Sequence, residues 1–561
     1  MPRPRALAPD GSDVQGFHFE ANRVTYLGDE PVEAGVRYEL ELPAADDPKW
    51  LVPGVLYGEN RSESCTRIYP RFTPGHVDVE RMESDAWAFR ADRCATPAVF
   101  SNGRGLATSE TSPVGQAGLG LALREGRPVV WLDFPYREEP LRYDGSERPQ
   151  PPDVQTYCWS PGESVELDVR EADSSVLRPA DPFEDPSWVS VEEAAELAAY
   201  SLHRDHYLSD PPRLVETRSF DGAQVRDAMH VSWVSGVPYA YALLRHARRV
   251  GNETYEAAAT AVLDHVAQHL TPGGTFWSQW THDRGWTWGW HPDHSRLHAR
   301  TLADATLFAL RAARLCDPGT RSLLAAAVRS NLDVVLRTQR DDGALPAAHH
   351  VETGDAVSWE GTAGMAWIPA LVEAGHVEEA RAAGEHFRRF ETWSGAPEDV
   401  DLAPTSEDGY AAVMAYVALE DWETARRAAD WMLTFRYTYD VAFDPETELG
   451  RRGFRTRGAD QASPANQHVH SFGLICLPEM IRLARATGEE WYERTTRENL
   501  ACFRQLVARH DGDFGARRGM TTERYYQTDV FAQKGGLLPL AHAWTTGVLL
   551  YGCESALELR L

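Results

Sequence analysis

Residues 190–207 read SVEEAAELAAYSLHRDHY, and this stretch marks the point where the period of the sequence changes. Ser190 and Glu193 have the Ser-x-x-Glu spacing of a capping box, and the polar residues that follow fall on one face of a helix. From here to residue 561 the apolar residues keep a helical period. The stretch therefore predicts a helical domain that spans residues 190–561.

The helical segments that follow are of two alternating kinds. One kind carries a stripe of charge, as in ETYEAAATAVLDHVAQHL (253–270), which is typical of a surface helix. The other kind, as in residues 226–249, 359–374 and 467–486, is rich in apolar and small residues and is expected to be buried. Six segments of each kind predict a toroid of six helical hairpins, the (α/α)6 architecture, with the apolar helices inside.

The loops of this domain are of unequal length. The connection QRDDGALPAAHHVETGDAVS (339–358) precedes an apolar helix, whereas the much shorter EAGHVEE (373–379) follows it. Long loops held on a rigid scaffold are a common place for binding and catalytic sites. We therefore expect the pocket at the N-terminal ends of the apolar helices.

The first third of the chain has the period of β-strands. Short alternating runs such as VRYELEL (36–42) and PVVWLDF (128–134) are separated by turn residues, which predicts an antiparallel β-sandwich. The stretch ADSSVLRPADPFEDPSW (172–188) breaks this period and predicts a linker. The predicted organisation is a sandwich over residues 1–171, a linker over 172–189 and the toroid over 190–561.

The composition limits the partners of the protein. With 84 acidic against 56 basic residues, the net charge of −28 opposes binding to nucleic acid or to an anionic membrane surface. Neither a membrane span nor the apolar core of a signal peptide is recognisable, so we expect a cytoplasmic protein. Seven cysteines without a CxxC pair, and no nucleotide-binding or zinc motif, predict no cofactor and no metal. Self-association into a homo-oligomer stays open.

Carboxylates stand at the starts of several apolar helices. Glu360 opens one in SWEGTAGMAW (358–367), Glu407 and Asp408 open another, and Asp529 precedes the last. An ionised carboxylate inside a core is costly unless it is paired, so each either faces water or performs chemistry. The alternative is ordinary capping, because the helix dipole stabilises acids in a first turn by about 0.3–1 kcal/mol.

Aromatic and polar residues accompany these acids in the same loops. In FWSQWTHDRGWTWGW (276–290), tryptophans alternate with polar residues, which suits the apolar faces and hydroxyls of sugar rings. The alternative is an aromatic plug that only packs under a long loop. The residues predicted to bind substrate are Trp280, Asp283, Trp286, Trp288, Trp290, His291, Trp359, Tyr410, Arg457, His468, His470, Tyr526 and Gln533.

Six hairpins after a β-sandwich, with Trp359-Glu360 at the third inner helix and Asp529 ahead of the sixth, resemble the (α/α)6 glycoside hydrolases. The layout is similar to that of the six-hairpin, glucoamylase-like glycosidases. The resemblance implies that Glu360 is the general acid and Asp529 the general base, and Glu407 and Asp408 are the next candidates. Inverting hydrolysis needs two such carboxyl groups about 6.5–9.5 Å apart. Burial beside Trp359 would raise the pKa of Glu360, as a general acid requires.

The sequence thus predicts a metal-independent, inverting glycoside hydrolase that cleaves an oligosaccharide by paired-carboxylate catalysis, and it leaves two alternatives. One is a uronate-specific lyase or an unsaturated uronyl hydrolase, because arginines precede His468 and His470 and could bind a uronate carboxylate. A tyrosine or histidine would then act as the base. The other alternative is a non-catalytic carbohydrate-binding or scaffold protein. The arginines concerned are Arg451, Arg452, Arg455 and Arg457, which could equally pair with the acidic surface.

Overall fold

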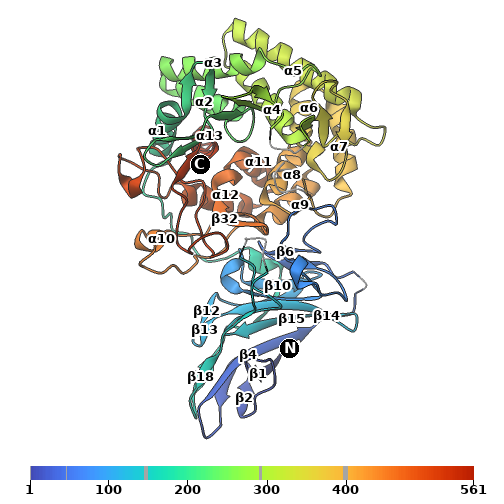
Figure 1. Ribbon diagram of the computed structural model, residues 1–561, viewed down its shortest axis with the longest axis vertical. Coiled ribbons are helices and arrows are strands. Elements are labelled where there is room, and N and C mark those ends of the chain that lie inside the picture. Colours follow the sequence, from blue (N-terminus) through green and yellow to red (C-terminus); the bar gives the residue numbers. More distant parts are fainter. Residues whose placement is uncertain (1, 46, 145–148, 290–292, 396–401) are drawn as a thin grey trace.

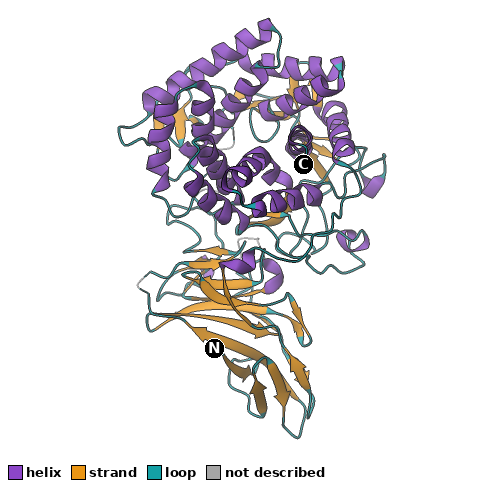
Figure 2. Cartoon of the chain, turned by 180° about the vertical axis from the view of Figure 1, so that it is seen from behind, coloured by secondary structure: helices purple, strands orange, loops and turns teal. Residues whose placement is uncertain are grey.

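The structure is a computed structural model that describes residues 2–45, 47–144, 149–289, 293–395 and 402–561. The strands of the first third gather in one part of the molecule, and the helices form the other part (Figures 1 and 2). Among the described residues, none of the helices combines the length and apolar character needed to cross a bilayer.

The N-terminal part is built on two antiparallel sheets that contact each other. Tyr38, Leu119 and Leu132 are buried, and each lies in an unbroken run of buried residues along its strand. One sheet has the order β1 (Arg3–Leu7), β4 (Val32–Glu41), β15 (Arg127–Phe134), β14 (Gly118–Arg124) and β9 (Ala86–Arg90), and β18 (Tyr157–Trp159) also pairs with β4. The other has the order β20 (Arg170–Asp173), β11 (Arg104–Ala107), β10 (Ala98–Ser101), β5 (Trp50–Val52) and β6 (Leu56–Tyr57).

The helical part contains an inner ring of helices. These helices are α2 (Val237–Val250), α4 (Ala299–Ala313), α6 (Trp367–Ala374), α8 (Ser406–Ala418), α11 (Leu477–Thr487) and α13 (Ala543–Leu559). Each contacts the next in this order, and α13 contacts α2, so the contacts close into a ring. Figure 2 shows this ring from behind. We call it the helical ring.

An outer helix packs against each inner one. In chain order the outer helices are α1 (Val191–Ser201), α3 (Glu253–Ala267), α5 (Pro318–Thr338), α7 (Val377–Arg388), α9 (Trp422–Leu433) and α12 (Glu490–Phe503). Helix α1 packs on α13, and each other outer helix packs on the inner helix that precedes it. The inner helices approach closely because their residues are small: a Cβ on Gly547 of α13 would lie 2.4 Å from the ring of Tyr239 on α2.

All three expected inner helices quoted above begin later than their apolar pattern predicts. The helix expected from residue 226 begins at Val237, the one from 359 at Trp367 and the one from 467 at Leu477. Part of the first and third intervals forms short strands: β25 (Ala228–His230) pairs with β26 (Gln279–Thr281), and β32 (Asn466–His470) pairs with β31 (Asp460–Ser463). The 3-10 helix η6 (Ser471–Cys476) then leads into α11. An apolar run of this length fits a buried strand as well as a helix, so the pattern alone gave the wrong start.

Candidate active site

Side chains from the N-terminal ends of the inner helices meet at one end of the helical ring. Trp233 precedes α2, Glu407 lies in the first turn of α8, and Trp544 lies in the first turn of α13. They line a cavity of about 80 Å³, which we call the mouth cavity. Its lining residues are Trp233, Thr405, Glu407, Ala462, Ser463, Asn466, His468, His470, Phe472, Glu523, Arg524 and Trp544.

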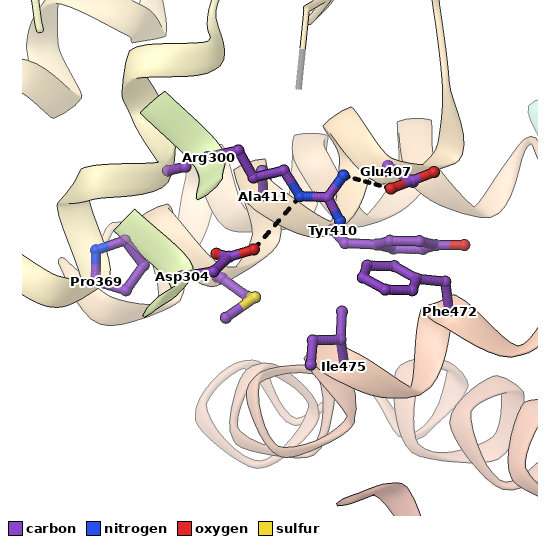
Figure 3. A pocket seen from close by; sticks show the side chains of 10 residues that line it. Arg300, Asp304, Pro369, Glu407, Tyr410, Ala411, Phe472 and Ile475 are labelled. Atoms are coloured by element: carbon purple, nitrogen blue, oxygen red, sulfur yellow. Dashed lines mark hydrogen bonds and ion pairs between the residues drawn. The ribbon is translucent and has the colours of Figure 1, made fainter. Parts of the chain in front are cut away.

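A smaller cavity of about 20 Å³ lies further along the inner helices (Figure 3). We call it the deep cavity. Glu407 and Phe472 line both cavities, and Tyr410 lines only the deep one. The deep cavity is lined by Arg300, Asp304, Ala366, Pro369, Glu407, Tyr410, Ala411, Met414, Phe472 and Ile475.

Arg300, in the first turn of α4, holds Glu407 in place. Its Nη1 donates a hydrogen bond to Glu407, and its Nε lies 3.4 Å from Asp304 one helical turn later. The guanidinium lies 4.6 Å from the ring centroid of Trp233 and 4.9 Å from that of Phe472. Burial raises the pKa of Asp304 to about 6, against the opposing effect of the Arg300 charge. A buried cation between two aromatic rings therefore fixes the position of the Glu407 carboxylate.

His468 and His470 stand two residues apart on β32, so both side chains lie on the same face of the strand. Their ring centroids are 5.8 Å apart, and both residues line the mouth cavity. Burial lowers the pKa of each imidazole, and the charge of Arg524 lowers the pKa of His468 further. His470 Nε2 lies 3.2 Å from Ser406 Oγ, while His468 Nδ1 has no hydrogen-bond partner among the described residues. Both imidazoles are therefore neutral at pH 7.

Glu523 and Arg524 contribute to the mouth cavity from the segment before α13. Glu523 is paired with His542 Nδ1 at 3.2 Å and with Arg524 Nε at 3.4 Å. Behind them, Glu216 accepts a hydrogen bond from Arg226 Nη1 at 3.0 Å. Burial raises the pKa of Glu216 to about 7; the Arg226 charge opposes this shift and the Glu523 charge adds to it. Within the described ranges, no three His, Cys, Asp or Glu side chains are grouped so that they could hold a metal ion.

Glu360 does not lie in the apolar surroundings expected for it. Its side chain is exposed, and its Oε1 accepts a hydrogen bond from Ser64 Oγ of the N-terminal part at 2.8 Å. Trp359 packs under Arg340, whose guanidinium carbon lies 3.9 Å from the ring centroid. The expectation of burial is wrong because residues 359–362 form a loop, and the helical turn begins only at η5 (Ala363–Ala366).

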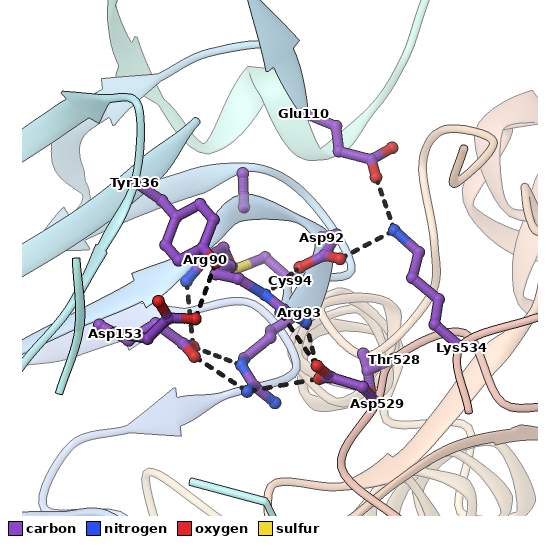
Figure 4. A network of polar contacts seen from close by, with 12 residues as sticks. Arg90, Asp92, Arg93, Cys94, Glu110, Tyr136, Asp153, Thr528, Asp529 and Lys534 are labelled. Atoms are coloured by element: carbon purple, nitrogen blue, oxygen red, sulfur yellow. Dashed lines mark hydrogen bonds and ion pairs between the residues drawn. The ribbon is translucent and has the colours of Figure 1, made fainter. Parts of the chain in front are cut away.

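Asp529 belongs to a polar network between the two parts of the chain (Figure 4). Arg90 donates two hydrogen bonds to its carboxylate, and Arg93 Nη2 lies 3.5 Å from Oδ1. Burial would raise the pKa of Asp529, but the charges of Arg93 and Arg90 outweigh it and lower the pKa. Nearby, Lys534 Nζ donates to Asp92 at 2.8 Å. These contacts bind Asp529 to the N-terminal sheet, whereas Glu360 is bound to a different loop.

Asp408 caps its own helix. Its Oδ2 accepts hydrogen bonds from the backbone N–H of Thr405 at 3.2 Å and from Thr405 Oγ1 at 2.7 Å, while Asp408 N–H donates to Thr405 Oγ1. This reciprocal pair is a capping box at the start of α8, and the Asp408 side chain is fully buried. The capping interpretation therefore accounts for Asp408, and Glu407 is the acid of this pair that lines the cavities.

The tryptophan-rich stretch forms a hairpin. Trp280 on β26 lies opposite Trp286 on β27 (Gly285–Thr287). Trp286 packs against two histidines of the outer wall, with ring centroids 5.0 Å from His265 and 5.2 Å from His269. Trp280 lies under the guanidinium of Arg213. These contacts agree with the alternative given above for this stretch, in which the tryptophans only pack against the protein under a long loop.

The remaining members of the predicted binding set have varied surroundings. Trp288 stacks on His294 with centroids 4.5 Å apart, and Asp283 is exposed. Tyr526 is buried and its backbone N–H donates to the carbonyl of Gly536, while Gln533 is exposed. Trp290 and His291 lie outside the described residues.

The arginines proposed for uronate recognition are paired with acids. Arg457 donates to both carboxylate oxygens of Glu498 on α12 and to the backbone carbonyl oxygens of Asp181 and Pro182. It therefore fastens the segment before α1 to the outer wall of the helical ring. The other three pair within their own loop: Arg451 and Arg452 with Glu448, and Arg455 with Asp440.

Several lining residues were not singled out from the sequence. Arg300 reads as an ordinary charge in the first turn of a helix, and Trp233 as part of an apolar run. Glu523 and Arg524 stand in the same stretch as Asp529, ERYYQTDVFAQKGG (523–536), and of these three residues only Glu523 and Arg524 line the mouth cavity. Glu216 belongs to no motif; it adjoins the site because β23 (Thr217–Ser219) pairs with β33 (Leu540–His542).

No family model matches the chain, and no curated protein matches it. Among solved structures, a D-mannose isomerase is 12% identical over 68% of this chain and 100% of its own, with a TM-score of 0.48. A polysaccharide lyase is 9% identical over 97% of this chain and 88% of its own, with a TM-score of 0.44. The unsaturated glucuronyl hydrolase of Bacillus sp. GL1 is 15% identical over 66% of this chain and 95% of its own, with a TM-score of 0.41. These similar structures are (α/α)6 enzymes that process carbohydrates.

Proposed function

We propose that this protein is a carbohydrate-active enzyme whose active site is the mouth cavity. The reaction that we favour is proton transfer at a sugar carbon next to a carbonyl group, which isomerises or epimerises the sugar. The observation that carries this proposal is the pair of neutral imidazoles, His468 and His470, side by side in the cavity wall. A neutral buried histidine is a suitable base for such a proton.

In this reaction one imidazole takes the proton from the carbon. The electron pair of the C–H bond becomes the C=C bond of an enediolate, and the π pair of the carbonyl group moves to its oxygen. The guanidinium of Arg524, which lines the same cavity, would stabilise the negative oxygen. The N-terminal ends of α8 and α13 add a favourable dipole at this end of the ring. For epimerisation, a proton then returns from an imidazolium to the other face of the same carbon. For isomerisation, the proton goes to the former carbonyl carbon, and the hydroxyl proton of the first carbon moves to the former carbonyl oxygen. Trp233 and Trp544 provide apolar walls for the sugar.

The charges of the cavity favour an uncharged sugar. Glu407 is paired with Arg300, and Glu523 is paired with Arg524. Of these two cations only Arg524 lines the mouth cavity, and it already has Glu523 as a partner. A uronate would bring a second carboxylate to Arg524, whereas the enediolate oxygen is the one anionic group that a neutral sugar presents to it.

Hydrolysis of a glycosidic bond is a second candidate, because two carboxylates line the same cavity. Glu407 reaches it from α8 and Glu523 from the segment before α13. Paired-carboxylate catalysis, proposed from the sequence for Glu360 and Asp529, would then use Glu407 and Glu523. In that case one of these two glutamates would protonate the leaving oxygen, and the other would activate a water molecule.

One assay separates these candidates. The protein is incubated in D₂O with a panel of neutral aldoses, ketoses and oligosaccharides, with and without phosphate, and the products are followed by NMR. We expect deuterium to enter the carbon next to the carbonyl as the sugar is converted. His468→Gln and His470→Gln should each lower this rate by about 10²-fold or more. The matched control, His510→Gln at an exposed histidine, should retain it.

Other results would assign a different reaction. New reducing ends without deuterium incorporation would support hydrolysis and contradict the proton-transfer proposal. An unsaturated product that absorbs in the ultraviolet would indicate β-elimination. If no sugar in the panel is converted, the catalytic proposal itself is overturned in favour of a binding role.

A further inference from the structure

The imidazole of His470 is held among aromatic rings in the wall of the mouth cavity. It stacks on Phe472, with 10° between the ring planes and 6.3 Å between the centroids. The Trp544 ring meets it edge-on at 5.9 Å, and the Tyr410 ring lies at 6.4 Å. His470 as a whole is only 3% exposed. Because these rings restrict the imidazole, each of its two nitrogens keeps one direction.

The two nitrogens of this imidazole have different surroundings. Nε2 lies 3.2 Å from the Oγ of Ser406, the first residue of α8. Nδ1 has no hydrogen-bond partner among the described residues, yet unlike His468 Nδ1 it is not one of the fully buried unpaired atoms. Since His470 lines the mouth cavity, Nδ1 is the nitrogen that a substrate in this cavity can reach.

The Ser406 hydroxyl has one proton for two neighbours. Its Oγ lies 3.2 Å from His470 Nε2 and 3.1 Å from the carbonyl oxygen of Ala462, which can only accept a hydrogen bond. Ala462 stands at a register shift between β31 and β32, where the ladder is interrupted. Ser406 is fully buried, so an unmet hydrogen-bonding group here would be costly. Both contacts are hydrogen bonds only if Ser406 donates to Ala462 and accepts from a proton on His470 Nε2.

The charges around His470 suit a base. Burial lowers the pKa of its imidazole, which keeps the ring neutral before the reaction. The charge of Arg300 acts in the same direction, and three carboxylates act against it, namely Glu407, Asp460 and Glu523. These negative charges stabilise the imidazolium that forms when the ring takes a proton.

We infer that Ser406 is a positioning residue that holds His470 in the tautomer with its proton on Nε2, so that the bare Nδ1 is the base that takes the proton from the sugar carbon. The inference rests on the reaction proposed above and names the atom that accepts the proton. The imidazolium that results keeps its Nε2–H on Ser406. His468 is the weaker candidate, because its buried Nδ1 has no partner among the described residues that would fix its tautomer.

The tautomer can be measured without a substrate. The full-length protein is labelled with ¹⁵N at its histidines and studied at pH 8 by long-range ¹H–¹⁵N NMR, in which a bare imidazole nitrogen resonates far downfield of a protonated one. His470→Gln identifies the His470 signals by their loss. We expect a protonated Nε2 and a bare Nδ1 in the parent. In Ser406→Ala the proton should move to Nδ1, because a proton on Nε2 would lose its acceptor, whereas one on Nδ1 can meet water in the cavity.

The same variants are then assayed with the sugar that the panel identifies. Ser406→Ala should lower kcat by about 10- to 100-fold with KM within about twofold, because only the molecules with a bare Nδ1 react. Ser406→Thr keeps the hydroxyl and should retain the parent spectrum and most of the rate. The matched control is Ser555→Ala, at a buried serine near the end of α13 whose hydroxyl donates to the carbonyl of Tyr551. It should change neither the His470 signals nor kcat, and thermal unfolding shows that each variant is folded.

A proton on Nδ1 of His470 in the parent would overturn the inference. So would a His470 spectrum that is the same in Ser406→Ala as in the parent. If Ser406→Ala moves the proton to Nδ1 but keeps the parent kcat, Nδ1 is not the base. A parent that converts no sugar would instead refute the proposed function, and the spectra would still decide whether Ser406 sets the tautomer.

Discussion

Arg90 and Asp529 join the two parts of the chain through a two-point ion pair. Nη1 donates to Oδ2 at 3.0 Å and Nη2 to Oδ1 at 2.7 Å, and the two residues are 439 positions apart in the sequence. The fork of an arginine matches a carboxylate in this geometry. Since Arg90 is nearly buried, the pair fixes the N-terminal sheet against the loop before α13.

Replacing Asp529 tests whether it is structural or catalytic. Asp529→Asn should lower the free energy of unfolding by about 1–3 kcal/mol, because the buried Arg90 and Arg93 lose a charged partner. The Asp529 side chain is 36% exposed, which favours the lower end of this range. Urea unfolding of the full chain measures the change. Asp333→Asn, at an exposed acid of α5, should stay within about 0.5 kcal/mol. A loss of turnover by Asp529→Asn without loss of stability would restore it as the general base.

Substitutions at Glu407 and Glu360 test which glutamate acts in catalysis: the one that lines the cavities or the one that the sequence pattern favours. Glu407→Gln should lower kcat/KM by about 10²-fold, because its carboxylate lines both cavities and would no longer pair fully with Arg300. Glu360→Gln should leave kcat/KM unchanged, because Glu360 is exposed and accepts its hydrogen bond from Ser64. The assay is the conversion of whichever sugar the panel identifies. The opposite result would support the general-acid role predicted for Glu360.

Removing Arg300 should leave two carboxyl groups in the deep cavity without their cation. Arg300→Met is expected to cost about 3–5 kcal/mol of stability at pH 8, as for a broken buried ion pair. The cost should be smaller at pH 5, because Asp304, whose pKa is already about 6, is then protonated. Urea unfolding at both pH values measures it, with Arg329→Met at an exposed position of α5 as control. An equal cost at both pH values would contradict the role given to Arg300.

Glu216 should make the protein less stable as the pH rises. Its folded-state pKa of about 7 lies above the ordinary value, so folding favours the protonated form. The stability it contributes is complete below about pH 4.3 and is lost as the pH rises through 7, a change of about 3 kcal/mol. Glu216→Gln should therefore be more stable relative to the parent at pH 8 than at pH 5, as measured by urea unfolding. Glu352→Gln, at an exposed loop position, should show no such difference, and an equal result for both variants would refute the assignment.

The sequence by itself determined the local structure and the end of the ring at which the mouth cavity lies. The change of period at Ser190 marks the start of α1, where the Ser190 side chain accepts from the backbone N–H of Glu193. Because an inner helix must be apolar on most sides, the alternation of apolar and charge-striped segments was readable from a period of 3.6 residues. Glu407, His468 and His470 were also singled out, since polar residues at the starts of buried helices are conspicuous.

Only the tertiary structure decided which of the acids face a cavity. Glu360 and Asp529 resemble Glu407 in local sequence, yet Ser64 and Arg90 from the N-terminal part bind them. Whether an acid faces a cavity depends on the path of its loop and on partners that lie hundreds of residues away in the sequence. The local period of the sequence encodes neither the loop path nor the partner. Arg300 likewise reads as a surface charge until the ring closes and places it between Trp233 and Phe472. Helix periodicity is a local property of the chain, whereas the direction of a loop carboxylate is set by the long-range contacts that satisfy its charge.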